Sequence, residues 1–168
     1  IQRFVPYNGL DAVYSEIRSI VLLELDYTTE ARNAERVGAG FAERAEVGFP
    51  RVIRELTTKR VLTTEFVEGC KVNDLRELDT KGINRTELAR LVIESYCEQI
   101  FRHGVYHADP HPGNILVSRA KGPNGGPKVT FIDFGAVAEL SDPMREGLID
   151  LVRAGLNRDT ARLTAALR

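Results

Sequence analysis

Tryptophan is absent from the sequence, and cysteine occurs only twice, as Cys70 and Cys97. Two cysteines so far apart do not form a metal site, and we interpret them as free thiols in a reducing compartment. The longest aliphatic run, Ile20 to Leu23, ends at Glu24 and is far too short to span a membrane. A signal peptide is also missing from the start. We therefore expect a protein that lies in the cytoplasm or is associated with a membrane on its cytoplasmic side.

An excess of charge of one sign is missing as well. The 23 Lys and Arg residues nearly balance the 24 Asp and Glu residues, which leaves a formal net charge of −1. A general electrostatic field for nucleic acid or an anionic membrane is thereby excluded, and no nucleic-acid partner is expected. The 168 residues, 43% of them hydrophobic and 28% charged, fit one folded domain with a real core.

Helical periodicity dominates the first part of the chain. Apolar residues recur at helical spacing over residues 11–40, where no proline occurs, which predicts a long helix with a possible break near residues 27–29. Glu24 falls on the apolar face of this helix, whereas Asp26 and Glu30 share another face. Each acid alone is interpreted most simply as a solvent-exposed side chain.

The middle of the chain predicts a hairpin followed by two helices. Residues 51–55 and 60–66 have the composition of two strands around a turn. Asn73-Asp74 is an N-cap signal for a short helix ending near residue 78, and Asn84 begins a core helix that ends before Gly104. If the chain is kinase-like, the backbone near Glu65 to Val67 would bind an adenine edge. From these residues alone, a plain hairpin strand is the better-supported interpretation.

Polar side chains bracket a second predicted hairpin. Asp109 and Asn114 precede the strands predicted at residues 115–117 and 129–132, and Asp133 follows them, with a helix predicted from Ser141 onward. Phosphoryl transfer from a nucleotide needs this set of groups, because one carboxylate orients the acceptor while an amide oxygen and a second carboxylate bind magnesium. The order Asp-x4-Asn, hairpin, Asp-Phe-Gly is the catalytic half of the protein-kinase signature.

Two other interpretations of this segment remain open. Imidazole and carboxylate groups also suit a transition metal, and four such residues cluster here, namely His103, His107, Asp109 and His111. Pro110 and Pro112 argue against this site, because they prevent a helix that would bring His107 and His111 onto one face. The segment could also be a purely structural turn with buried, hydrogen-bonded polar groups.

Four segments of the sequence carry a family resemblance: Glu24-Leu25-Asp26-Tyr27-x-x-Glu30-Ala31-x-Asn33-Ala34, Val67-x-Gly69-x-x-x-Asn73-Asp74, His107-x-Asp109-Pro110-His111-Pro112-Gly113-Asn114 and Asp133-Phe134-Gly135. Through these segments the chain resembles the UbiB/AarF family of atypical, protein-kinase-like proteins over about residues 15–160. The resemblance implies an α+β fold of the protein-kinase type, with a partial N-lobe over about 1–66 and a mostly helical C-lobe over about 67–168. It also implies ATP and Mg²⁺ as cofactors and a link to ubiquinone or isoprenoid-quinone lipid metabolism.

Roles for individual residues follow from this resemblance. The catalytic set would be Asp109 as the catalytic-loop acid, Glu30 as the helix glutamate that pairs with a nucleotide-binding lysine, and His107. Asn114 and Asp133 would bind the metal. The cofactor-site residues would be Glu65 and Val67 at the hinge, with Glu24 and Asp26 facing an N-terminal extension of the family.

The departures from the family pattern limit what residues 1–168 are expected to do. The family's Lys-x-Gly-Gln motif, Ala-rich loop and strand lysine are absent and would lie upstream of Ile1, and Lys59, Lys71 and Lys81 are in the wrong places to serve. We therefore expect a fragment that binds nucleotide weakly and turns over little. The resemblance favours an ATP-dependent kinase or ATPase that acts in lipid-quinone metabolism. The alternatives to it are a catalytically incomplete remnant or nucleotide-binding module, and a kinase of the aminoglycoside or choline type. Glu24-Leu25-Asp26-Tyr27 argues against the last. Quinone-biosynthesis proteins, lipid, and a membrane reached through elements outside the chain are possible partners.

Overall fold

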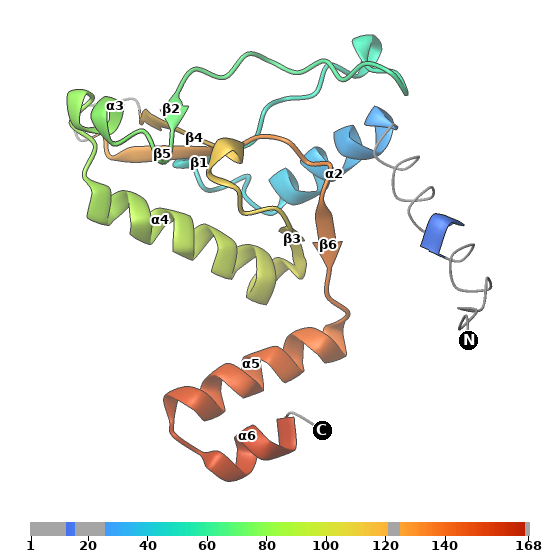
Figure 1. Ribbon diagram of the computed structural model, residues 1–168, viewed down its shortest axis with the longest axis vertical. Helices are drawn as coiled ribbons and strands as arrows, with labels where there is room; N and C mark the ends of the chain where they lie inside the picture. Colours follow the sequence, from blue (N-terminus) through green and yellow to red (C-terminus); the bar gives the residue numbers. More distant parts are fainter. Residues whose placement is uncertain (1–12, 16–25, 121–124, 167–168) are drawn as a thin grey trace, which may run out of the picture.

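The structure is a computed structural model that describes residues 13–15, 26–120 and 125–166. Helices and strands are interspersed along the chain, and the strands that precede α3 are very short (Figure 1). In chain order the elements are α2 (Tyr27–Ala39), β1 (Val47–Gly48), η1 (Arg54–Leu56), β2 (Cys70–Lys71), α3 (Leu75–Thr80), α4 (Arg85–Cys97), η2 (Glu98–His103), β3 (Val105–His107), η3 (Pro112–Asn114), β4 (Ile115–Arg119), β5 (Pro127–Phe131), β6 (Val137–Glu139), α5 (Asp142–Leu156) and α6 (Thr160–Ala166).

A four-stranded sheet in the order β1-β5-β4-β2 forms the centre of the fold. Strands β4 and β5 are antiparallel and pair from Ile115↔Phe131 to Arg119↔Pro127, so the hairpin predicted before Asp133 is confirmed. Strand β1 joins β5 in parallel, and β2 joins β4 antiparallel. The sheet thus takes strands from both sides of the predicted lobe boundary at 66/67, and that boundary stays a prediction.

Helix α4 covers one face of the sheet and closes the core (Figure 1). Val117, Val129 and Phe131 at the centre of the β4–β5 hairpin have no exposed surface. The Tyr96 ring of α4 meets Phe131 edge-on, with ring centroids 5.4 Å apart. Burying each such aliphatic or aromatic side chain stabilises the fold by about 1.5–3 kcal/mol. The core therefore holds the hairpin, and with it the site residues at the hairpin's open end.

Helix α2 begins at Tyr27, inside the region where a break in a longer helix was expected. The break itself stays a prediction, because residues 16–25 lie outside the described residues. Asp26 is its N-cap, and the Asp26 carboxylate accepts hydrogen bonds from the backbone N–H and the hydroxyl of Thr28. The buried face of α2 consists of Ala31, Ala34 and Val37, whose small size lets the helix backbone lie close to the rest of the molecule. The part of the predicted helix at residues 11–12 and 16–25, Glu24 included, lies outside the described residues.

The strands predicted at residues 51–55 and 60–66 are wrong as regular strands. The two segments do run antiparallel, but they form only the isolated bridges Val52↔Thr64 and Thr58↔Val61. The 3₁₀ turn η1 occupies the end of the first segment, and the Thr57 hydroxyl donates a hydrogen bond to the Ile53 carbonyl. A side chain that bonds to nearby backbone competes with a ladder of strand hydrogen bonds, and here the turn prevails over β propensity.

The helices predicted after the first hairpin are confirmed together with their caps. Asp74 caps α3, and the Asn84 carbonyl oxygen accepts from the Thr86 and Glu87 N–H groups at the start of α4. The last turn of the predicted core helix is a π-helix, η2, and ends at Gly104 with φ +68°. A side chain is disfavoured at this left-handed position, which explains the glycine.

Helices α5 and α6 pack against each other and extend away from the sheet beyond β6 (Figure 1). Ser141 caps α5, as its sequence indicates, and Pro143 lies in the first turn. None of the helices within the described residues is both long enough and apolar enough to cross a membrane.

Candidate active site

The loop between β3 and β4 has a dense set of short-range hydrogen bonds. One oxygen of the Asp109 carboxylate accepts from the His111 backbone N–H at 3.3 Å, and the other accepts from the Asn114 side-chain N–H at 2.8 Å. Because Asn114 donates through its nitrogen, its carbonyl oxygen is left for another partner. Asp109 itself is exposed. The loop therefore holds an accessible carboxylate and an amide oxygen in fixed relation to each other.

Within this loop, the His111 ring and Gly113 fit closely together. The His111 Nδ1 atom accepts the Gly113 backbone N–H at 3.0 Å, which caps the short helix η3. A Cβ atom on Gly113 would lie 2.8 Å from that same nitrogen, closer than real Cβ atoms approach other atoms. The neighbouring ring, and not a positive φ, is therefore what favours glycine at position 113, because a Cβ atom there would force the ring to move.

The Asp133–Gly135 segment follows β5 and lies beside this loop. The Ile132 N–H donates to the Asn114 carbonyl at 2.9 Å, which joins the two backbones. Asp133 adopts φ +65°, an uncommon conformation for a residue other than glycine. The Asp133 carboxylate is exposed and accepts the Gly135 N–H at 3.2 Å. The segment therefore presents a second carboxylate on a backbone that needs outside support.

His107 supplies part of that support from the interior. It is only 1% exposed, and its Nδ1 atom accepts the Asp109 N–H, so the proton is on Nε2. Nε2 donates to the Asp133 carbonyl at 2.6 Å. The contacts of this buried side chain hold the loop and Asp133 in position, and the catalytic role of His107 stays a prediction.

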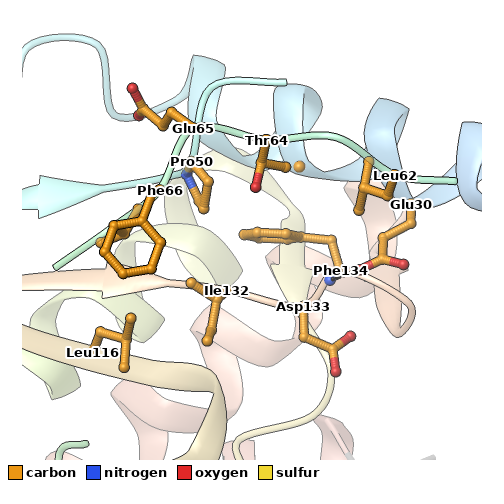
Figure 2. A pocket seen from close by; sticks show the side chains of 12 residues that line it. Glu30, Pro50, Leu62, Thr64, Glu65, Phe66, Leu116, Ile132, Asp133 and Phe134 are labelled. Atoms are coloured by element: carbon orange, nitrogen blue, oxygen red, sulfur yellow. Dashed lines mark hydrogen bonds between the residues drawn. The ribbon is translucent and has the colours of Figure 1, made fainter. Parts of the chain in front are cut away.

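An apolar cavity of about 380 Å³ lies next to Asp133. Figure 2 shows Phe66, Leu116 and Ile132 on one side of this cavity, and Glu30, Asp133 and Phe134 on the other. Its size and largely apolar lining are typical of a small-molecule site. Among the residues that the structure describes, no lysine or arginine lines it.

Glu65 and Val67, predicted at the hinge, both line this cavity. The Glu65 N–H is already bonded to the Arg51 carbonyl at 2.9 Å. Over the described part of the chain, the Glu65 carbonyl and the Val67 N–H have no hydrogen-bonding partner. One free acceptor and one free donor, two residues apart, are what the edge of an adenine ring requires.

Glu30 reaches the cavity from α2. One of its carboxylate oxygens accepts the Phe134 backbone N–H at 3.1 Å. Burial raises the pKa of Glu30 and the nearby Asp133 charge raises it further, whereas the hydrogen bond from Phe134 opposes both. Glu30 is thus at the predicted place, but its partner here is a backbone amide and not a lysine side chain.

Asp26 lies apart from this group. It does not line the cavity, and its hydrogen bonds with Thr28 cap α2 and lower the pKa of the Asp26 carboxyl. A cofactor role for Asp26 stays a prediction, as does the role of Glu24, which lies outside the described residues.

The donor set fits magnesium better than a transition metal. In the described parts of the chain, three or more His, Cys, Asp or Glu side chains do not come together in a group that could bind a metal. The histidine-rich metal cluster is therefore not formed there: His107 bonds to Asp133, and the His103 ring packs edge-on against Phe41. Magnesium needs only one or two protein oxygens besides substrate phosphates, and Asn114 and Asp133 offer such oxygens.

Three polar residues that border the site had no role assigned to them from the sequence. The Gln99 side-chain oxygen, completely buried on η2, accepts the His107 N–H at 2.9 Å. Asn33 on α2 donates to the Phe134 carbonyl at 3.0 Å. Burial, with the nearby Asp109 charge, raises the pKa of Tyr96 to about 12, so its hydroxyl stays protonated. An amide or hydroxyl on the apolar face of a helix was the available signal.

Comparisons with known proteins place this geometry in a family. Residues 1–167 match the ABC1 atypical kinase-like domain. The chain is 41% identical over 156 residues to the chloroplastic Protein ACTIVITY OF BC1 COMPLEX KINASE 8 of Arabidopsis thaliana, covering 93% of this chain and 20% of that protein. It is 33% identical over 138 residues to the probable serine/threonine-protein kinase abkD of Dictyostelium discoideum, covering 82% and 20%. The chain thus spans about a fifth of the length of these relatives.

A solved structure supports the same fold. Rv3197 of Mycobacterium tuberculosis, determined in complex with erythromycin, superposes with a TM-score of 0.71 at 24% identity, over 99% of this chain and 40% of that one. The α+β, kinase-like fold expected from the sequence is therefore confirmed. Since the family match extends over residues 1–167, the chain belongs to the ABC1 atypical kinase-like family.

Proposed function

We propose that residues 1–168 carry the metal-binding and adenine-binding part of an ATP- and Mg²⁺-dependent atypical kinase or ATPase. The observation that carries the proposal is the connection of Asp109 and Asn114 to the segment of Asp133, which lines an apolar cavity. The Asn114 side chain donates a 2.8 Å hydrogen bond to Asp109. The Asn114 backbone carbonyl accepts a hydrogen bond from the N–H of Ile132, the residue before Asp133. The opposite side of the cavity offers a free backbone donor and acceptor at Val67 and Glu65.

Each group has a separate task in this proposal. The Glu65 carbonyl and Val67 N–H would bind the adenine edge, and the apolar side chains would exclude water from the ring. The Asp133 carboxylate and the side-chain carbonyl oxygen of Asn114 would hold magnesium, which neutralises phosphate charge when it is bound. Asp109 would orient the acceptor hydroxyl or water and take its proton. Asn114 keeps the Asp109 carboxylate in place through the bond from its side-chain nitrogen.

For the phosphoryl acceptor we propose a class of molecule and not a single compound. The resemblance to the UbiB/AarF family suggests a role that supports ubiquinone or another isoprenoid-quinone lipid. Lipid, quinone-biosynthesis proteins and a membrane surface are the partners that this role would require. The lining of the cavity is largely apolar, and the charged side chains on it in the described residues, Glu30, Glu65 and Asp133, are all acidic and do not by themselves select a particular acceptor.

A second candidate is a nucleotide-binding module without turnover. It is favoured by one observation: within the described residues, Glu30 is bonded to the Phe134 amide, and no cationic side chain lines the cavity to contact phosphates. Hydrolysis of ATP by the full-length gene product would favour the enzyme. Binding of nucleotide without hydrolysis would favour the module.

The decisive experiment is nucleotide binding by the full-length gene product, with and without Mg²⁺, measured by thermal shift. A ligand present at a hundred times its Kd stabilises a protein by about 2.7 kcal/mol, which is a shift of several degrees. We expect Asp133→Ala to remove the Mg²⁺-dependent part of the shift, and Asp150→Ala on the exposed side of α5 to retain it. A wild-type protein that shows no shift with ATP and Mg²⁺ would contradict the proposal.

A further inference from the structure

The peptide groups around Phe134 are held by one helix at two points. The Phe134 N–H donates to Glu30 and the Phe134 carbonyl accepts from the Asn33 side chain, at 3.1 and 3.0 Å. Glu30 and Asn33 are three residues apart and therefore lie on the same face of α2. Figure 2 shows Glu30 directed at the Phe134 backbone, with the Asp133 carboxylate directed away from it. Helix α2 thus fixes both polar backbone groups of the residue that follows Asp133.

Asp133 depends on such support because its backbone is in the left-handed region. A non-glycine residue at φ +65° is strained by about 1–2 kcal/mol, and such a conformation persists only where the surroundings hold it. His107 holds the Asp133 carbonyl on one side. On the other side, the two bonds from α2 hold Phe134, and the Phe134 ring is buried against His107 and Phe49.

The hydrogen bonds of Glu30 and Asn33 to Phe134 differ in how readily a bound cation could break them. Glu30 is an acid that a cation could draw away from the Phe134 N–H. Asn33 is a neutral amide, and it donates to a carbonyl that has no other hydrogen-bonding partner among the described residues. Asn33 can therefore keep the Phe134 peptide in register whether or not Glu30 remains bonded to it.

We propose that Asn33 is a positioning residue for the metal site, which acts through the Phe134 carbonyl to hold the Asp133 carboxylate where it binds Mg²⁺. This inference rests on the proposed function insofar as Asp133 binds the metal. The hydrogen-bonding part of it does not, because the bond between Asn33 and Phe134 exists without ligand. The side chain itself contacts neither nucleotide nor metal in this scheme.

The test compares Asn33→Leu and Asn33→Ser in the full-length gene product. Leucine keeps the size of the side chain and loses the donor, and serine stays polar but is too short to reach the Phe134 carbonyl. The matched control is Arg32→Ala, an exposed neighbour on the same helix whose side chain donates to the Thr29 hydroxyl. The first readout is hydrogen exchange at the Phe134 and Gly135 amides in ligand-free protein. The second is the Mg²⁺ concentration needed for half of the ADP-induced thermal shift.

In both Asn33 variants we expect faster exchange at these two amides and unchanged exchange in α4. We also expect the Mg²⁺ concentration needed for half of the ADP-induced thermal shift to rise about three- to tenfold. ADP binding in the absence of Mg²⁺ should be unchanged. Arg32→Ala should alter neither readout. A lower Tm with unaltered Mg²⁺ dependence and exchange would overturn the proposal and leave Asn33 with a merely structural role. A wild-type protein that binds no nucleotide would refute the proposed function, whereas unchanged exchange in the variants would refute the role of Asn33 alone.

Discussion

The two segments that form the candidate site are held in opposite ways. In the 109–114 loop, the bonds to Asp109 and His111 come from residues no more than five positions away. In the Asp133–Phe134 segment, the supporting bonds come from His107, Asn33 and Glu30, which are 26, 101 and 104 positions away. The first segment stabilises itself, and the second takes its conformation from the folded core.

This difference predicts where the site is vulnerable. A change in the loop removes one local contact, and the loop's two prolines still restrict its backbone. A change beneath Asp133 removes contacts that exist only when α2, β3 and β5 are already packed together. Mutations of the long-range set should therefore cost more stability than matched mutations of the loop.

Phe134→Ala should have the largest effect. The Phe134 ring is 3% exposed and packs against His107 and Phe49, so its removal leaves a cavity beneath Asp133. A cost of about 3 kcal/mol in the free energy of unfolding is expected from urea denaturation. Phe66→Ala is the control, because Phe66 is 89% exposed and its loss should change stability by less than about 0.5 kcal/mol. Equal costs for the two variants would contradict the comparison.

His107→Phe and His111→Phe compare one histidine of each kind. Phenylalanine at position 107 keeps a ring in the core but leaves the part-buried Asp133 carbonyl without its bond from Nε2. A loss of about 1–3 kcal/mol is expected at position 107 and a smaller loss at position 111, where water replaces the broken bond. Urea denaturation of both variants measures the difference, and a greater loss at position 111 would reverse the proposed order.

The same division explains what the sequence could predict. The β4–β5 hairpin and the caps at Asp74, Asn84 and Ser141 rest on neighbouring residues, and the structure confirms them. The bond from Asn33 to Phe134 spans 101 residues and leaves no periodic signal, so it was not predicted.

Errors arose where local propensity and tertiary structure conflict. Residues 51–55 and 60–66 have the composition of strands, yet a 3₁₀ turn and the Thr57 hydroxyl limit them to isolated bridges. A catalytic role for His107 stays a prediction, and only the packed structure reveals that this side chain is buried. Side-chain burial depends on the whole fold, so a motif identifies residue types more reliably than it identifies roles.

Gly113→Ala examines the local segment alone. A Cβ atom would lie 2.8 Å from the His111 Nδ1 atom, so the exposed ring must rotate away and lose its bond to the Gly113 N–H. We expect a cost of about 1 kcal/mol in urea denaturation. Combining it with His111→Ala should cost no more than His111→Ala alone, because the ring that clashes is gone. Gly126→Ala, where a Cβ atom meets nothing within 4 Å, is the neutral control. A strictly additive double variant would show that the ring is not the cause.

Glu30→Gln should give the smallest effect, and its sign is informative. Burial, with help from the Asp133 charge, raises the pKa of Glu30 above 4.5, so the folded state binds a proton more tightly than the unfolded state does. The resulting stability is fully present below the unfolded-state pKa and is lost as the pH rises through the higher folded-state value. Glutamine does not titrate and can still accept the Phe134 N–H. The stability of Glu30→Gln relative to wild type should therefore increase as the pH rises from about 4.5 toward neutrality, which urea midpoints at a series of pH values will measure.

A relative stability that decreases over this window would mean that the ionised form of Glu30 is favoured in the folded protein. A cation paired with Glu30 from outside the described residues would have this effect, and the second segment would then depend on one more long-range contact than α2 and His107 supply.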